Sequence, residues 1–323
     1  MTTLNRFARY AWGVLAFNLL VVLWGAYVRA SGSGAGCGSH WPLCNGEVIP
    51  RPEHVEMLVE LTHRATSGVA FLLVLGMLVW AFRAYPAGST VRRGAAASMV
   101  LMVMEALLGA GLVLFELVAE NRSAFRAFSM AAHLANTFLL LGAIALTAWW
   151  GSGGRRVRLR GQGTAGWILH GALLATLVVG VTGALTALGD TLFPKTALGL
   201  DLSLSGTRHF LERLRIVHPV VAVLTALYVF LAGWLIQRFR PDAATRRLAG
   251  AVGALWAVQL AAGALNVALL APVWMQLVHL LVADLAWLAL VLLSASALAV
   301  PGTRERTAEE AQAPAGALLS HPG

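Results

Sequence analysis

The chain has 323 residues, of which 58% are hydrophobic and only 12% are charged, and its mean hydropathy is +0.73. This composition excludes a soluble globular protein and is typical of a membrane protein. A net charge of +9 is large enough for a nucleic-acid-binding protein, but the positions of the basic residues along the chain give a different explanation.

Apolar runs of about 20 residues recur along the chain, and each is long enough to cross a bilayer core of about 30 Å. Helices satisfy their own backbone hydrogen bonds in lipid, and the runs are too long and too uniformly apolar to be barrel strands. We therefore predict an all-α integral membrane protein. Its eight transmembrane helices are expected at roughly residues 11–29, 65–84, 95–118, 129–150, 166–188, 215–236, 248–270 and 277–299.

The first apolar run could also be read as a signal peptide. It is longer than a typical h-region, however, and no clear small-residue cleavage site precedes the next loop. We expect it to be a retained helix.

Arginines are concentrated in alternate loops. Fifteen of the 24 basic residues lie before the first run, after the eighth, or in the links between runs two and three, four and five, and six and seven. By the positive-inside rule, both termini are cytoplasmic in a multi-pass protein of the cell membrane. The basic charge thus reports topology, and no nucleic-acid partner is expected.

Both cysteines, Cys37 and Cys44, lie in the first outer loop. Disulfides form and persist outside the cytoplasm, and the neighbouring glycines and Pro42 allow a tight turn. A metal site with His40 is the alternative, but two thiols and one imidazole give no standard four-ligand set. We expect a disulfide, and the spacing leaves open whether it is structural or redox-active.

Two carboxylates lie close to, or within, the apolar runs. Glu60 precedes His63 by three residues, which places both on one face of the helix start. There it could offset the helix dipole or, beside a bound cofactor, move protons or stabilise a cationic intermediate. Glu105 lies near the middle of the third run, and Gln259 holds the matching place in the seventh. We therefore expect Glu105 to have a hydrogen-bonded packing role rather than a catalytic one.

The eight runs form two weakly similar sets of four, which predicts two pseudo-repeated four-helix bundles. Four histidines recur in register, in the first turn or so of every even-numbered run and at one depth near the outer face: His63, His133, His218 and His279. A single histidine near a helix end is commonly an interfacial residue. A set of four in register favours ligands, and imidazoles are common axial ligands of haem iron in helical bundles.

This pattern divides the chain into four parts. An N-terminal half, residues 1–150, carries the cysteine loop and two of the histidines. A cytoplasmic linker, 151–163, joins it to a C-terminal half, 164–300, and a tail rich in Ala, Pro, Gly and Glu, 301–323, is expected to be disordered.

The loop SGSGAGCGSHWPLCNG, followed by ELTHR, resembles the haem A synthase family, membrane enzymes of cytochrome oxidase assembly. The eight runs and the four histidines extend the resemblance over most of the chain. It implies oxidation of the C8 methyl of haem O to a formyl group by successive hydroxylations.

The resemblance also implies residue roles. His63 and His133 would hold the substrate haem O, and His218 and His279 would hold a haem b that transfers electrons. Glu60 matches the family's catalytic carboxylate. The disulfide Cys37–Cys44 would help to pass electrons or stabilise the substrate site.

The implied partners are a haem O synthase that supplies the substrate, a membrane electron donor (a quinol or a thiol system) and the lipid bilayer, and a homo-oligomer is compatible with the pattern. Two features depart from the family. Residues 190–212 lack the second cysteine pair of some members, and His218 is followed by Pro219 where His63 is followed by Arg64. Arg213 or Arg215 could replace that arginine.

Two other functions use part of the same pattern. A dihaem electron carrier linked to quinol would use the four histidines but would need neither Glu60 nor the cysteine loop. A transporter would fit the internal repeat, although no run is broken near its midpoint.

Overall fold

In the computed structural model the described residues are 4–48, 50–158, 160–193 and 210–299. Over these ranges the chain is helical and contains no named strand. The helices are α1 (Arg6–Ala30), η1 (Ser33–Ala35), α2 (Val55–Ala84), α3 (Thr90–Leu114), α4 (Ala124–Gly151), α5 (Gly163–Leu192), α6 (Phe210–Phe239), α7 (Ala243–Ala268) and α8 (Val273–Ala297). Eight of them are long and apolar enough to cross a membrane, which confirms the predicted all-α membrane fold with eight spans. The predicted disordered tail lies outside the described residues.

Several helices begin before the apolar run that predicted them. α2 begins at Val55 and α6 at Phe210, because their first turns contain charged residues such as Glu56 and Glu212 that a helix accommodates but a hydropathy window reads as loop. The four histidines consequently lie about two turns inside their helices. The expectation that they occupy the first turn was wrong.

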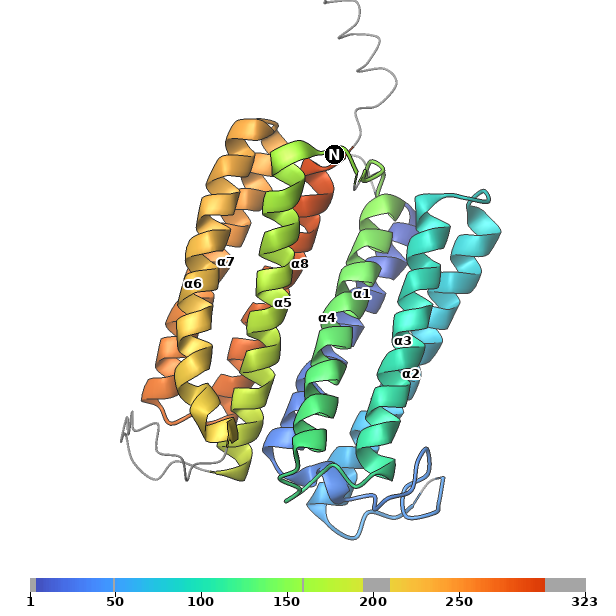
Figure 1. Ribbon diagram of the computed structural model, residues 1–323. Helices are drawn as coiled ribbons and strands as arrows, with labels where there is room; N and C mark the ends of the chain where they lie inside the picture. The colour runs from blue at the N-terminus through green and yellow to red at the C-terminus, as the bar shows by residue number, and fades with distance from the viewer. Residues whose placement is uncertain (1–3, 49, 159, 194–209, 300–323) are drawn as a thin grey trace, which may run out of the picture.

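Figure 1 shows the helices as two groups, α1–α4 and α5–α8, side by side and roughly parallel. α1 and α4 contact α5 and α8 across the boundary. The core around Phe138 of α4 includes Trp287, Leu288 and Val291 of α8. The Trp287 ring stacks on Phe138 with centroids 5.4 Å apart, and its Nε1–H donates to the Phe138 carbonyl at 2.6 Å. The core of the first group therefore extends onto α8, while the second group has a core cluster of its own.

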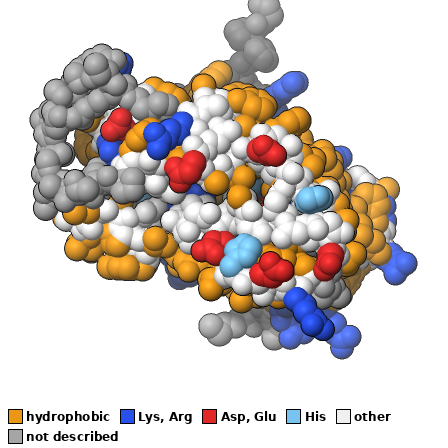
Figure 2. Space-filling model, turned by 90° about the horizontal axis from the view of Figure 1, so that it is seen from below, with side chains coloured by type: hydrophobic (Ala, Val, Ile, Leu, Met, Phe, Trp, Pro, Cys, Tyr) orange, Lys and Arg blue, Asp and Glu red, His pale blue; other side chains and the backbone are white. Residues whose placement is uncertain are grey.

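The two ends of the bundle differ in character. One end carries the α1–α2 loop with both cysteines and is here called the disulfide end; Figure 2 views the molecule from this side, where several acidic side chains gather. The exposed acidic residues of the adjoining loops and helix ends are Glu47, Glu53, Glu56, Glu116 and Glu120. At the opposite end, the linker end, Asn5 donates to the Gly151 carbonyl at 2.8 Å and the Arg158 amide donates to the Leu298 carbonyl at 3.0 Å.

Four helices begin at a side chain that accepts a hydrogen bond from the first turn, namely at Asn5, Ser89, Ser123 and Asp242. Such N-caps satisfy amides that have no partner within the helix. At Asp242, partial burial opposes ionisation, but hydrogen bonds from Thr245 and the neighbouring backbone outweigh it and hold the pKa of the carboxyl below its usual range.

Candidate functional site

Each of the four histidines packs against a glycine of the preceding helix. A Cβ built on that glycine would lie close to the histidine Cε1 atom. The distances are 2.8 Å for Gly25 and His63, 3.9 Å for Gly109 and His133, 3.0 Å for Gly183 and His218, and 3.1 Å for Gly263 and His279. The absent side chains leave room for the imidazole rings between α1 and α2, α3 and α4, α5 and α6, and α7 and α8. Sequence inspection missed Gly25 and Gly183 as site residues, although Gly109 and Gly263 end the matched segments that begin at Glu105 and Gln259.

The histidines also approach one another in pairs. His63 and His133 are near enough for their charges to interact, and so are His218 and His279. All four lie about two turns from the N-terminus of a helix that begins at the disulfide end. The structure thus brings together the pairs that the sequence proposes, one pair in each helix group.

Three of these histidines have a buried ring nitrogen without a hydrogen-bond partner in the part of the chain that the structure describes. The Nδ1 atoms of His63, His133 and His279 are buried and have no aligned hydrogen-bond partner among the described residues. His218 Nδ1 lies 3.0 Å from the Thr182 hydroxyl. Buried polar atoms without partners are costly, and imidazoles arranged in pairs within a helical bundle fit the axial ligands of a haem iron. The residues present therefore fit the cofactor that the sequence pattern implies.

The two cysteines form a disulfide, with an S–S distance of 2.00 Å and a Cα–Cα distance of 4.4 Å. This confirms the predicted bond. It excludes a metal site built on free thiols, because both sulfur atoms are used. Both residues are buried and pack with Met57 and Leu61 of α2.

Glu60 fastens this loop to α2. Its Oε2 accepts a hydrogen bond from the Cys37 amide at 2.8 Å, and its Oε1 accepts from Arg64 Nη2 at 2.5 Å and Nε at 3.1 Å. Arg64 Nη1 in turn donates to the carbonyls of His40 and Leu43. Glu60 is buried, and its hydrogen-bond partners are the Cys37 amide of the loop and the Arg64 side chain rather than the amides of the first helical turn. The main role of the Glu60 carboxylate is thus to hold the loop on α2, and not to offset the helix dipole.

The arginines proposed to replace Arg64 in the second group have different settings. Arg213 is exposed. Arg215 Nε donates to Asp190 Oδ1 at 2.7 Å, and its Nη2 donates to the carbonyls of Gly189, at 3.2 Å, and Phe193. Arg215 therefore ties the start of α6 to the end of α5, much as Arg64 ties α2 to its loop.

Arg29, at the end of α1, was not singled out from the sequence. Its Nη1 donates to the Ala187 carbonyl at 2.7 Å and to Thr191 Oγ1 at 2.6 Å, and its Nη2 donates to Gln276 Oε1 at 2.8 Å. These contacts join α1 to α5 and α8. The sequence shows an arginine at the end of an apolar run, but it does not show that this arginine bonds to α5 and α8.

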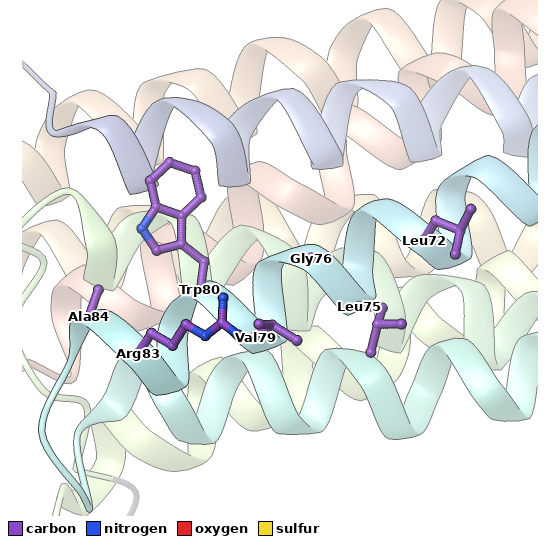
Figure 3. A pocket seen from close by; sticks show the side chains of 7 residues that line it. All are labelled: Leu72, Leu75, Gly76, Val79, Trp80, Arg83 and Ala84. Atoms are coloured by element: carbon purple, nitrogen blue, oxygen red, sulfur yellow. The ribbon is translucent and has the colours of Figure 1, made fainter.

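A hollow of about 660 Å³ lies along α2 in its linker-end half, between Leu72 and Ala84. Figure 3 shows Trp80 and Arg83 beside it. Leu72 follows His63 by nine residues, or about 13 Å of helix. The hollow is therefore separate from the histidine site.

The fold and these side chains define a multi-span membrane protein with two pairs of histidines set near one end of its bundle. The chain belongs to the COX15-CtaA family, described as cytochrome oxidase assembly protein, whose family model matches residues 8–291. The predicted family resemblance is confirmed.

Individual relatives give two kinds of match. A protein of Thermus thermophilus named protoheme IX farnesyltransferase is 57% identical over 91% of this chain and 49% of its own length. This chain thus spans about half the length of that relative. A heme A synthase of Exiguobacterium sibiricum is 28% identical over 69% of this chain and 72% of its own. A heme A synthase of Bacillus mycoides is 40% identical over 35% and 36% respectively.

Proposed function

We propose that this chain is a haem A synthase, an oxidoreductase that converts the C8 methyl of haem O into a formyl group. Each of two monooxygenase-type hydroxylations replaces a C–H bond by a C–OH bond: one oxygen atom of O2 enters the product, and the other leaves as water with two electrons and two protons supplied through the membrane donor. The twice-hydroxylated carbon then loses water to give the formyl group. The observation that carries the proposal is the placement of two histidine pairs against glycines in two neighbouring helix groups, in a chain of the COX15-CtaA family.

His63 and His133 are assigned to the substrate haem O, and His218 and His279 to haem b. Bound haem b would supply electron transfer. The disulfide loop lies at the same end of the N-terminal group, where Glu60 and Arg64 hold it on α2. Glu60 is assigned a catalytic role through this position, since it is a buried carboxylate one helical turn before His63.

The membrane orientation follows from charge. Arginines gather in the loops of the linker end, so we assign that end to the cytoplasm and the disulfide end to the outer face of the cell membrane. A membrane electron donor, quinol or thiol, would then act from the bilayer or the outer face.

The name of the Thermus relatives describes farnesyl transfer to protohaem, which is a different step. Heme A synthases match this chain as well. We therefore assign the transfer to the part of the Thermus proteins that this chain does not cover. A haem O synthase of that kind would supply the substrate.

The test is expression in cells that make haem O, followed by extraction of the haems and their identification by chromatography and mass. Haem A is expected with the wild type and is expected to vanish with His63→Ala or Glu60→Ala. His170→Ala is the matched control, because His170 is an exposed histidine in the linker-end half of α5. Haem B alone, in a protein that still cycles between oxidation states, would favour the dihaem electron carrier. Protein without any haem would overturn both functions.

A further inference from the structure

Glu105 on α3 and Gln259 on α7 hold matching places in the sequence, and each reaches the histidine of the next helix. Glu105 Oε1 lies 3.3 Å from His133 Nδ1. Gln259 Nε2 lies 3.2 Å from His279 Nε2. The first histidine therefore faces a carboxylate and the second a neutral amide.

The Glu105 carboxylate is held in one orientation by α4. Asn136 Nδ2 donates to its Oε2 at 2.6 Å, and the Thr137 hydroxyl donates to its Oε1. The same Asn136 amide also donates to the Leu101 carbonyl on α3 at 2.9 Å. These neighbours are donors, as an ionised carboxylate requires. The contact with His133 is thus built by residues of both helices.

His133 Nδ1 needs such a partner. The atom is buried and has no aligned hydrogen bond among the described residues, while the Glu105 oxygen lies within 3.3 Å. A small rotation of the ring would turn this contact into a hydrogen bond. A histidine that ligates a metal commonly donates its other ring N–H to a carboxylate or carbonyl, which fixes the ring and makes it a more basic ligand.

We infer that Glu105 is a positioning residue that orients His133 and makes it a stronger electron donor to haem iron than His279, which faces Gln259. This inference rests on the proposed function, in which both histidines bind haem. A more basic axial ligand stabilises the oxidised iron and lowers its reduction potential. The single carboxylate-to-amide difference then gives the substrate haem and haem b different electronic settings within similar histidine pairs.

The test is a redox titration, followed by optical absorbance, of the full chain purified in detergent with the haem it acquires in cells. Glu105→Gln is expected to move one haem component to a more positive potential and leave the other unchanged. A tenfold change in the ratio of reduced to oxidised haem corresponds to about 59 mV for this one-electron couple. Gln259→Glu is expected to move the other component to a more negative potential.

Glu56→Gln is the matched control, since it removes the same charge from an exposed position on α2. Wild-type and Glu105→Gln proteins with bound haem and equal potentials would overturn this inference and leave the proposed function standing. Wild-type protein without haem would overturn the proposed function itself. If Glu105→Gln loses its haem, Gln259→Glu decides: an unshifted component overturns the inference, and a negative shift supports it.

Discussion

The backbone amide of Cys37 donates a hydrogen bond to Glu60 Oε2 at 2.8 Å, across 23 residues of sequence. The contact fixes one half of the disulfide to α2, and the ion pair of Glu60 with Arg64 fixes the carbonyls of the same loop. The predicted catalytic carboxylate is therefore also the anchor of the loop. A substitution at Glu60 has a structural consequence that an activity assay alone would not separate from catalysis.

The first prediction concerns that anchor. Glu60→Ala leaves the Cys37 amide without its acceptor and removes the carboxylate that pairs with Arg64, and loss of a hydrogen bond to a charged group costs about 1.5–3 kcal/mol. Local opening of the loop should become easier, so a water-soluble reductant should cleave the disulfide roughly ten- to hundredfold faster. The reduction rate of Glu60→Gln should lie between those of the wild type and Glu60→Ala, because the glutamine amide oxygen still accepts a hydrogen bond from the Cys37 amide. The rate is measured by labelling of the released thiols.

Glu56→Ala is the control for this experiment. Glu56 is exposed one helical turn before Glu60, so its removal should leave the reduction rate unchanged. Equal rates in the wild type and in Glu60→Ala would show that the loop does not depend on this carboxylate.

The second prediction concerns the glycines. A Cβ at position 25 would lie 2.8 Å from His63 Cε1, closer than nonbonded carbon atoms approach, so Gly25→Ala must displace the imidazole. Ligands need placement within about 0.5 Å, and we expect this variant to lose the haem of the N-terminal pair. Haem content per protein is measured by absorbance after extraction.

Two alanine substitutions provide contrasts for Gly25→Ala. Gly13 lies on the same helix with nothing within 4 Å of a Cβ, and a Cβ at Gly109 would lie 3.9 Å from His133, an ordinary contact. Gly13→Ala and Gly109→Ala should both keep their haem. Full haem content in Gly25→Ala would mean that the ring has room to move.

The helices and the disulfide could be predicted from the sequence. The helices follow from the length of each apolar run, and the disulfide follows from two cysteines in one short outer loop. The start of α2 at Val55 could not, since the charged Glu56 reads as loop although it lies in the first turn of the helix. Partners far apart along the chain were also out of reach. The contact of Gly25 with His63 and that of Arg29 with Gln276 depend on how each helix is rotated about its axis, which hydropathy alone does not determine.

The third prediction concerns Arg29, whose guanidinium joins α1 to α5 and α8 through three hydrogen bonds. Arg29→Met removes all three, and we expect the thermal unfolding midpoint in detergent to fall, with a loss of at least about 2 kcal/mol. Arg29→Lys keeps the charge but cannot reproduce the planar set of guanidinium donors. Its unfolding midpoint should therefore lie between those of the wild type and Arg29→Met. Arg9→Met, at an exposed position of the same helix, should change little. An unfolding midpoint unchanged by Arg29→Met would show that these three hydrogen bonds do not stabilise the protein.

The last prediction concerns Asp284, near the midpoint of α8. The residue is fully buried, and neither carboxylate oxygen has a hydrogen-bond partner among the described residues. An unsatisfied buried polar group costs about 1–3 kcal/mol, so Asp284→Ala should raise the unfolding midpoint of the protein measured without haem. Asp284→Asn keeps an unpaired polar group and should bring no gain. Ser294→Ala on the same helix removes a hydroxyl that donates to the Leu290 carbonyl at 2.8 Å, and should lower the midpoint instead.

Ionisable groups inside membrane spans are rare and commonly functional. A functional role would explain why the chain keeps a destabilising carboxyl at Asp284. The carboxyl lies on the helix that packs against both groups of the bundle. If Asp284→Ala stabilises the protein but slows haem A formation in cells, the carboxyl is retained for activity. If the variant is stabilised and forms haem A at the wild-type rate, the buried acid has no role in the reaction. A lowered midpoint would show instead that the carboxyl has a stabilising partner, such as a buried water.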